Sequence, residues 1–560
     1  MNEVAAVVRF LLRGSDKHLA ADDDNTAVAG ALAASSAQDP AAVRHFCKND
    51  PGGVVLGELA DVDEERLVTV AADRLFAHWS ITGPSGVGKT FYLLHLRYLS
   101  LLRGIPHWLF DVKGETYTLT RRLILEYADR LPPREADDLL SKIVCVDLFS
   151  TDALPCLIDE LGPGDDPEVV AWSLASVWLE ATRTTVGVVQ EAVWHRPIEC
   201  LLRAHESLLL LPYVYAQPEI LDQLASRSDA PAVFHETAAR LRSAGRERLN
   251  SLIARCERLL RLGQVRRMLV GRQARSFDDL LAGGYSVLVN LAAPAGAPDL
   301  TKFAAGLLWL RLARAILRRP EGGLRVLVAL EEFPQFLSGS GPAVANSVEE
   351  LLRLARSRRV FLQTLQQDMA SVSAISSILP TVLTTNAGWV VLFRSSEGFD
   401  WSWALPTTGR RLKRPPCLPW EEARVASMSA SEEATVLRQE LARLPSRTAY
   451  LVDRHSGLAG IKIRTPELKI PGRTDLARLD AKALEIGFVQ RVADLARAES
   501  RIRERARTLA EGEGSHAEPA KDPLPSTTPD GTVESSAPPP SPAAAVPRVS
   551  SPRRRPGGIG

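Results

Sequence analysis

The sequence predicts an α/β fold with a mainly parallel central sheet, an all-α insertion and a disordered C-terminal tail. Helical patterns separate most of its short apolar runs, and this alternation is typical of parallel sheets covered by helices. The runs are residues 79–82, 108–110, 143–146, 287–291, 326–330, 360–365 and 389–393. Residues 163–271 show helical patterns and no strand pattern, which predicts the insertion. From Gly512 onward Pro, Ser, Ala and Gly dominate, and so few large apolar groups cannot repay the entropy of ordering.

Composition is that of an ordinary globular protein. The chain is 45% hydrophobic and 24% charged, and 68 lysines and arginines balance 67 acidic residues. The resulting charge of +1 gives no global reason to bind nucleic acid or anionic membrane, so such contact would need a local patch. The six cysteines form no Cys-x-x-Cys pair and no His/Cys cluster, which favours a reducing cytosol without zinc. No segment offers the roughly 18 uncharged apolar residues of a membrane span, so we expect a cytoplasmic protein without one.

A phosphate-binding loop follows the first predicted strand. The segment Gly83-Pro84-Ser85-Gly86-Val87-Gly88-Lys89-Thr90 has the form G-x-x-x-x-G-K-[ST], and the helical pattern of residues 91–102 follows it. The glycines let backbone N–H groups curve around a phosphate at the start of the helix. Lys89 is expected to neutralise β and γ oxygens, and Thr90 to hold Mg²⁺. The sequence therefore predicts a P-loop NTPase that binds ATP and Mg²⁺.

A second strand ends in two carboxylates. Glu331 and Glu332 directly follow the apolar run Val326–Leu330. A P-loop needs acidic groups at such a strand end, because one helps to hold Mg²⁺ and another polarises the attacking water. We therefore expect Glu331 at the metal and Glu332 as the hydrolytic carboxylate. The alternative is a buried strand with an ordinary solvated acidic end.

Other strand ends carry polar residues that suit a nucleotide site. Gln366 follows the sixth run, and beside the Glu331 strand its amide would reach the γ-phosphate or its water and report hydrolysis. The segment Asp111-Val112-Lys113-Gly114-Glu115 follows the second run, and Asn386 and Arg394 flank the seventh. Each of these is a weak signal by itself. A glutamine taken alone, for example, is more often a helix cap or a surface residue.

Taken together, the ordered segments resemble the HerA/FtsK superfamily of ring-shaped DNA-pumping ATPases. They are G-P-S-G-V-G-K-T, F-D-V-K-G-E, S-F-D-D-L-L-A-G-G-Y-S-V-L-V-N-L, L-V-A-L-E-E-F, L-Q-T-L-Q-Q and N-A-G-W-V-V-L-F-R. Within the superfamily, the chain is most similar to the HerA-like ATPases and the type IV secretion coupling proteins (TraG/TraD-like). The resemblance covers about residues 53–466, and coupling proteins carry an all-α insertion of the kind expected here.

The resemblance implies a RecA-like P-loop fold, an ATP-driven DNA translocase and roles for the matched residues. It assigns phosphates and metal to Lys89 and Thr90, hydrolysis to Glu332 and nucleotide sensing to Gln366. In such rings an arginine from one subunit completes the neighbour's site, which implies a homo-oligomer, most simply a hexamer. Arg394 is the expected arginine. The other candidates are Arg356, Arg358 and Arg359.

On this basis the chain is expected to have six parts. They are an N-terminal helical and linker segment (1–50), the first part of the ATPase domain (51–162), the insertion (163–271), the second part of the ATPase domain (272–470), a long helix (471–511) and the disordered tail (512–560). The long helix is predicted because leucine, isoleucine and valine recur at helical spacing between Leu476 and Leu495.

Two departures from the family pattern bear on function. Glu331 stands where aspartate is usual, and its extra methylene shifts the carboxylate and so alters Mg²⁺ geometry. The family's membrane-anchored members have N-terminal transmembrane helices, and their absence from this sequence favours a cytosolic HerA-like motor or one recruited by a partner. The string Leu337-Ser338-Gly339-Ser340-Gly341 resembles the ABC-transporter signature, but it follows the acidic strand instead of preceding it, so that reading is rejected.

Arginine clusters provide the local positive patches. Close-spaced arginines on helices can follow a phosphate backbone without reading its sequence, which predicts non-specific DNA contact. A solvated helix face is the equally open alternative. The clusters are Arg240, Arg242, Arg246, Arg248, Arg255, Arg258, Arg261, Arg266 and Arg267 in the insertion, and Arg410, Arg411, Lys413 and Arg414.

Three functions remain open on these residues. The first is an ATP-driven DNA translocase working as a ring, in DNA transfer, DNA processing, or mobile-element or anti-phage defence. The second is an ATP-gated assembly or recruitment module that docks effector or secretion-system proteins, with hydrolysis as a switch. The third is a nucleotide-binding scaffold that does not hydrolyse. DNA-stimulated ATP turnover separates the first from the others, and turnover without DNA dependence separates the second from the third.

Overall fold

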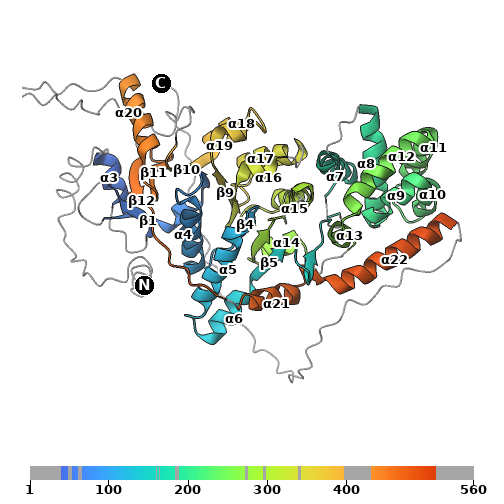
Figure 1. Cartoon of the computed structure of the whole chain (residues 1–560), viewed down its shortest axis with the longest axis horizontal. Helices are drawn as coiled ribbons and strands as arrows, with labels where there is room; N and C mark the ends of the chain where they lie inside the picture. The colour runs from blue at the N-terminus through green and yellow to red at the C-terminus, as the bar shows by residue number, and fades with distance from the viewer. Residues whose placement is uncertain are drawn as a thin grey trace, which may run out of the picture. The chain divides into compact units, whose positions relative to one another are not determined.

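A computed structural model describes the greater part of the chain (Figure 1). The described residues are 40–47, 53–60, 66–158, 161–162, 164–182, 188–270, 275–293, 298–338, 342–395, 430–458, 460–473 and 475–511. The expected tail, the arginine cluster of residues 410–414 and most of the expected segment 1–50 lie outside them.

An 11-stranded sheet with the order β2-β1-β12-β11-β10-β3-β9-β8-β4-β7-β5 forms the centre of the fold. Neighbouring strands from β10 to β5 are all parallel, which confirms the predicted sheet. These strands are β3 (His78–Thr82), β4 (His107–Asp111), β5 (Ile143–Asp147), β7 (Ser286–Asn290), β8 (Val326–Leu330), β9 (Val360–Gln366) and β10 (Ala387–Leu392). The sheet continues through strands that pair antiparallel, namely β11 (Thr448–Asp453), β12 (Ile461–Arg464), β1 (Val54–Leu59) and β2 (Leu67–Val70).

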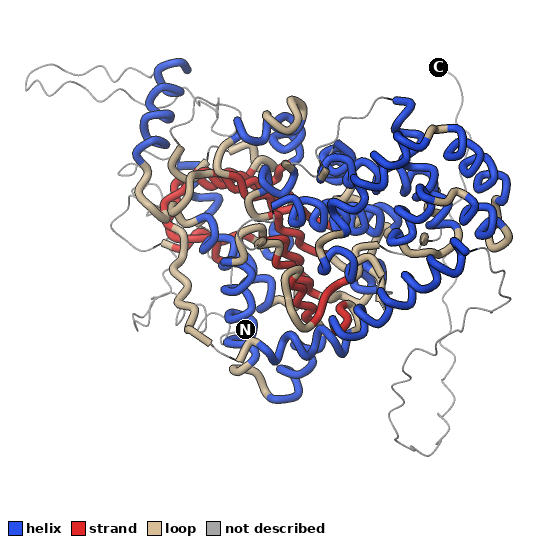
Figure 2. Tube along the Cα trace, turned by 45° about the vertical axis from the view of Figure 1, so that its right-hand side comes forward, coloured by secondary structure: helices blue, strands red, loops and turns tan. Residues whose placement is uncertain are grey.

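Helices cover both faces of the parallel strands, and Figure 2 shows the strands as one band between them. Every residue of β3, β4, β8, β9 and β10 is buried, as a parallel sheet with two covered faces requires. Successive residues alternate between two cores: Trp108 and Phe110 belong to one core, and Leu109 belongs to the other. Helices α4 (Lys89–Leu102) and α5 (Glu115–Ala128) pack into the Leu109 core. Helices α15 (Pro298–Arg318) and α17 (Pro342–Leu354) pack into the other core.

The remaining elements of this α/β part are helices. They are α3 (Pro40–Phe46), η1 (Ala72–Leu75), α6 (Pro133–Ser141), α14 (Phe277–Ala282), α16 (Phe333–Leu337), α18 (Met369–Ser373), α19 (Leu379–Asn386) and α20 (Ala430–Arg443). A separate two-stranded sheet pairs β6 (Ala153–Pro155) with β13 (Val489–Arg491).

Between β6 and α14 the elements that the structure describes are all helical. They are α7 (Pro167–Ala181), α8 (Val188–Arg203), η2 (Leu208–Leu210), α9 (Leu211–Ala216), α10 (Glu219–Ala225), α11 (Pro231–Ser243), α12 (Arg246–Leu260) and α13 (Gly263–Met268). They share a core with the sheet, since the ring of Trp178 on α7 lies 5.2 Å from that of Phe303 on α15. These helices occupy the position predicted for the insertion.

The predicted long C-terminal helix is divided in two. Helix α21 (Ala477–Ile486) ends at Gly487, whose φ of +80° is a left-handed conformation that glycine adopts without strain. Strand β13 follows, and then α22 (Val492–Glu511) runs along the insertion (Figure 1). There Arg266 Nε donates to Glu499 Oε1 at 2.6 Å, and Gln223 Nε2 donates to the Leu509 carbonyl at 3.0 Å. The single long helix expected over residues 471–511 is therefore replaced by two helices, because the spacing of apolar residues does not reveal the break at Gly487.

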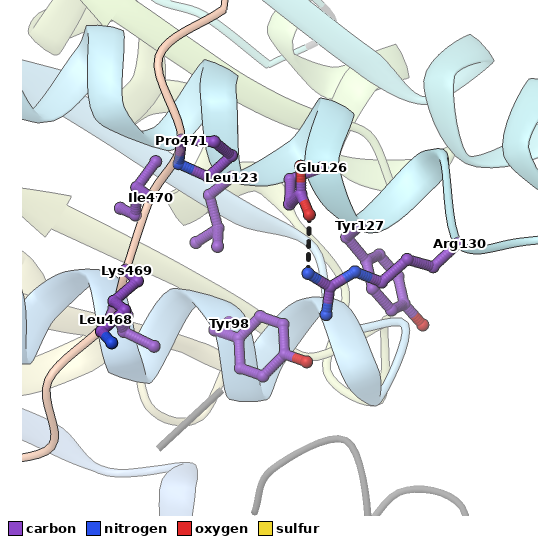
Figure 3. A pocket seen from close by; sticks show the side chains of 9 residues that line it. All are labelled: Tyr98, Leu123, Glu126, Tyr127, Arg130, Leu468, Lys469, Ile470 and Pro471. Atoms are coloured by element: carbon purple, nitrogen blue, oxygen red, sulfur yellow. Dashed lines mark hydrogen bonds and ion pairs between the residues drawn. The ribbon is translucent and has the colours of Figure 1, made fainter. Parts of the chain in front are cut away.

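Residues 468–471, between β12 and α21, pass over α4 and α5 (Figure 3). They cover Leu123 and Tyr98, and the nearby Arg130 and Glu126 of the same pocket pair at 2.6 Å. The cavity left beneath them is about 10 Å³, which is roughly the space that one water molecule needs. This pocket therefore reflects how the C-terminal part of the chain packs and has no room for a ligand.

Candidate functional site

The loop of residues 83–90 joins β3 to α4 and depends on glycine for steric reasons. Gly83, Gly86 and Gly88 all have positive φ angles. A Cβ on Gly83 would lie 2.6 Å from the Cβ of Phe393, which follows the neighbouring strand β10. A Cβ on Gly88 would meet Arg447 at 3.3 Å, and the Arg447 N–H donates to the Val87 carbonyl at 2.7 Å. The predicted P-loop is thus present between its strand and helix, braced by β10 and by the start of β11.

Lys89 turns its side chain back into this loop. Its ammonium donates to the carbonyl oxygens of Gly83 and Pro84, the second at 2.9 Å. Burial lowers the pKa of Lys89, and the nearby Glu332 carboxylate opposes that shift. The positive charge therefore lies inside the loop, where backbone N–H groups and the helix start favour phosphate oxygens.

Glu331 and Thr90 meet at the carboxyl edge of the sheet. The Thr90 hydroxyl donates to Glu331 Oε1 at 3.1 Å, while the buried Glu331 Oε2 has no hydrogen-bond partner among the described residues. Burial, assisted by the negative charge of Asp111, raises the pKa of Glu331 to about 7. An unpartnered carboxylate oxygen beside a threonine hydroxyl fits Mg²⁺, a hard cation that takes oxygen ligands. These two residues would hold the metal.

Glu332 is held in a different way. It has φ +49° and ψ +53°, a left-handed conformation that costs a non-glycine residue energy and often marks functional positions. Its carboxylate forms an ion pair with Lys113, and the Gln367 amide donates to both of its oxygens at 3.2 Å. The side chain of Glu332 is thus fixed from two neighbouring strand ends, after β4 and after β9.

The D-x-K-G-E element builds the turn that presents Lys113. Asp111 Oδ1 accepts the Lys113 N–H and Asp111 Oδ2 accepts the Tyr117 N–H, both at 2.8 Å. Gly114 has φ +79°, and a Cβ there would approach Asn290 at the end of β7 to 3.0 Å. Asp111 therefore orders the start of α5, and Lys113 reaches the neighbouring Glu332.

Gln366 ends β9 and Gln367 follows it, and the two side chains have different surroundings. Gln366 is fully buried, and its amide donates to the hydroxyls of Ser80 at 2.7 Å and Thr82 at 2.9 Å. Gln367 is the exposed neighbour that contacts Glu332. Lys113 and Gln367 were not assigned roles from the sequence. Both belong to the motifs D-x-K-G-E and L-Q-T-L-Q-Q, but strand alternation could not distinguish the two glutamines, because both faces of β9 are buried.

The candidate arginines lie at opposite ends of the parallel strands. Arg394 is exposed and follows Phe393, whose N–H donates to the Thr82 carbonyl at 2.9 Å, so it lies at the P-loop edge. The other three candidates lie in the turn before β9. Because β9 runs parallel to β3, this turn lies at the amino-terminal ends of the strands, away from the P-loop. These three are Arg356, Arg358 and Arg359.

Ion pairs offset part of the predicted positive patch on the insertion. Arg240 pairs with Glu236, Arg242 with Asp222, and Arg266 with Glu499. Arg255 and Arg261 form no ion pair with another described residue.

The described part of the chain holds no group of three or more His, Cys, Asp or Glu placed to bind a metal. Among the helices of the described residues, none has the length and apolar character of a membrane span.

The comparisons with known proteins find likeness in structure alone. No family model matches the chain, and neither does any curated protein sequence. The plasmid coupling protein TrwB in complex with a non-hydrolysable GTP analogue is 15% identical, with a TM-score of 0.48, over 77% of this chain and 93% of that one. VirB4 of Thermoanaerobacter pseudethanolicus is 14% identical, with a TM-score of 0.47, over 77% of this chain and 99% of that one.

These solved structures include coupling proteins, the group that the sequence motifs resemble. The fold class rests on the chain itself: its P-loop strand β3 and acidic strand β8 are separated by the single strand β9 in a mainly parallel sheet. The chain therefore has a P-loop NTPase fold with a mainly parallel central sheet, as predicted.

Proposed function

We propose that the chain is an ATPase that works as a homo-oligomeric ring, expected to be a hexamer, and moves DNA without reading its sequence. One observation carries the hydrolytic part: Lys89, Thr90, Glu331 and Glu332 meet at one edge of the sheet although 241 positions separate Thr90 from Glu331. A phosphate loop, a metal-binding pair and a fixed carboxylate are the parts that phosphoryl transfer to water requires.

The residues divide the work as follows. Lys89 binds β and γ oxygens, and Thr90 with Glu331 orients the metal-bound nucleotide. A bound Mg²⁺ neutralises charge on the phosphates. Glu332 accepts a proton from water while the water oxygen bonds to the γ-phosphorus and the bond to the bridging oxygen breaks. Lys113 and Gln367 position the Glu332 carboxylate, and we assign the sensing of γ-phosphate to Gln367. The predicted sensor Gln366 would act only through Ser80 and Thr82, to which its buried amide donates.

Exposed arginines support the proposal that the chain forms a ring and binds DNA. Arg394 is exposed at the P-loop edge, where a neighbouring subunit could receive it. Arg255 and Arg261 of the insertion present positive charge that no described carboxylate neutralises. The ion pairs of Arg240, Arg242 and Arg266 leave less free positive charge for DNA. The second candidate is therefore kept: an ATP-gated module that docks effector or secretion-system proteins.

Glu332→Gln is expected to retain ATP binding and to lower turnover by about 100-fold or more, because the amide cannot accept the proton. Lys89→Ala should lose ATP binding itself. The matched control is Glu321→Gln, the same change at an exposed acid distant from the loop. Nucleotide affinity and single-turnover hydrolysis are measured for all three. Turnover that survives in Glu332→Gln and stops in Glu331→Gln would reverse the assignment of the two carboxylates.

Binding of ADP with Mg²⁺ is expected to weaken by about tenfold from pH 8 to pH 6. The raised pKa of Glu331, about 7, means that its neutral form predominates below pH 7, whereas the metal needs the carboxylate. Calorimetry at each pH should show a proton released on binding near pH 6. Glu331→Gln controls for the titration of the nucleotide, and an equal pH slope in this variant would contradict the assignment.

Mixing two inactive variants tests the ring. Glu332→Gln and Arg394→Ala subunits should each turn over little ATP alone, while a mixture should recover activity. Recovery is expected because some interfaces then combine an intact Glu332 with an intact Arg394 from the neighbour. Light scattering checks that oligomers form. Mixed oligomers without recovery, or full activity in a monomer, would remove Arg394 from the shared site.

DNA dependence separates the two candidate functions. ATP turnover should rise with duplex or single-stranded DNA of any sequence. Arg255→Gln/Arg261→Gln should lower DNA affinity and reduce the salt slope by about 2. Arg240→Gln/Arg242→Gln makes the same charge change at paired arginines and should have less effect. Turnover that no DNA stimulates would favour the docking module.

A further inference from the structure

A polar pocket of about 260 Å³ lies at the amino-terminal ends of the parallel strands, whereas the P-loop lies at their carboxyl-terminal ends. Strands β3 and β10 begin there, and the antiparallel β11 ends there. The polar side chains that line it include those of His78, Arg353, Arg356, Asn386, Arg454 and His455. They come from the start of β3, the end of α17, the turn before β9, the end of α19 and the turn after β11.

Three guanidinium groups line this pocket, and no carboxylate lines it. Arg454 Nη1 donates to the Thr384 carbonyl at 2.6 Å. Arg353 and Arg356 form no ion pair with another described residue. The nearby Asp453 is engaged elsewhere, by an ion pair with Arg74 and by the His455 N–H at 3.0 Å. Converging positive charges repel one another and together favour an anion between them.

His78 adds a hydrogen-bond donor that the protein leaves unused. Its side chain is 2% exposed, and its Nδ1 accepts the Leu362 N–H at 2.8 Å. The proton of the neutral ring therefore lies on Nε2, and the buried Nε2 has no partner among the described residues. Burial, with Arg356 nearby, lowers the pKa of His78 to about 4, so the ring stays neutral at physiological pH. A neutral N–H at the wall of a positive pocket suits an oxyanion.

We propose that this pocket binds a phosphate group, with Arg353, Arg356 and Arg454 supplying charge and the His78 Nε2–H a hydrogen bond. Guanidinium groups offer planar pairs of donors that match phosphate oxygens. The phosphate belongs either to a nucleic-acid backbone or to a free phosphate compound. The site needs no hydrolysis, and it is distinct from the P-loop, because the two lie at opposite ends of β3, roughly 13 Å apart at about 3.3 Å per residue.

The test uses the full chain with its P-loop saturated by ADP and Mg²⁺. Pyrophosphate and, separately, a duplex DNA without terminal phosphates are titrated by calorimetry into wild type and Arg353→Gln/Arg356→Gln. The control Arg438→Gln/Arg443→Gln removes two exposed arginines of α20, with the same loss of charge. Pyrophosphate affinity should fall at least tenfold in the pocket variant and stay within twofold in the control.

The DNA arm identifies the source of the phosphate. A parallel tenfold loss of DNA affinity in the pocket variant assigns the site to a nucleic-acid backbone, and unchanged DNA affinity assigns it to a free phosphate compound. Equal losses in pocket and control variants would overturn the proposal, since bulk charge would then explain the binding. Unchanged pyrophosphate affinity, or succinate binding as tightly as pyrophosphate, would also overturn it.

A second measurement does not depend on any variant. The ¹⁵N resonance of His78 Nε2 should shift on addition of pyrophosphate to the wild-type protein, because the N–H gains an acceptor. A resonance that stays in place while pyrophosphate binds would locate the binding elsewhere. ATP turnover in Arg353→Gln alone, which leaves the candidate arginine Arg356 intact, keeps the two proposals separate, since weaker pyrophosphate binding with normal turnover affects the pocket alone.

Discussion

The candidate site depends on strand β9, which pairs in parallel with β3 on one side and with β8 on the other. Thr82, the last residue before the P-loop, pairs with Gln366, and Leu330, the last residue before Glu331, pairs with Thr364. This register fixes how far the phosphate loop stands from the acidic strand end. It also sends Gln366 into the sheet beside Ser80 and Thr82, and leaves Gln367 to contact Glu332.

The two adjacent carboxylates are both buried but have different polar partners. Burial and the negative charge of Asp111 raise the pKa of Glu331, so a bound cation would have to displace its proton. Glu332 is held instead by direct polar contacts with Lys113 and Gln367. One strand end thus carries a group suited to bind Mg²⁺ together with nucleotide and a group already placed to act on water.

Much of this arrangement could be predicted from the sequence, because the motifs have strict steric and chemical requirements. The Gly83 to Thr90 loop, the acidic end of β8 and the helical insertion each follow from local patterns. The antiparallel strands beyond β10, the break at Gly487 and the partners of Glu332 could not be predicted in this way. They depend on contacts distant in sequence, such as Lys113 with Glu332 across 219 positions, that no local pattern records. The pairing of insertion arginines with acids was hidden for the same reason.

The central claim is that these strand ends form a nucleotide site, and a crystal structure with Mg²⁺ and a non-hydrolysable ATP analogue tests it most directly. The account predicts phosphates within the loop of residues 83–90, with Lys89 Nζ moved from the Gly83 and Pro84 carbonyls onto phosphate oxygens. It also predicts the metal beside Thr90 and Glu331, and a water between the γ-phosphate and Glu332. Nucleotide bound elsewhere, or Lys89 still bonded to the loop carbonyls with nucleotide present, would contradict it.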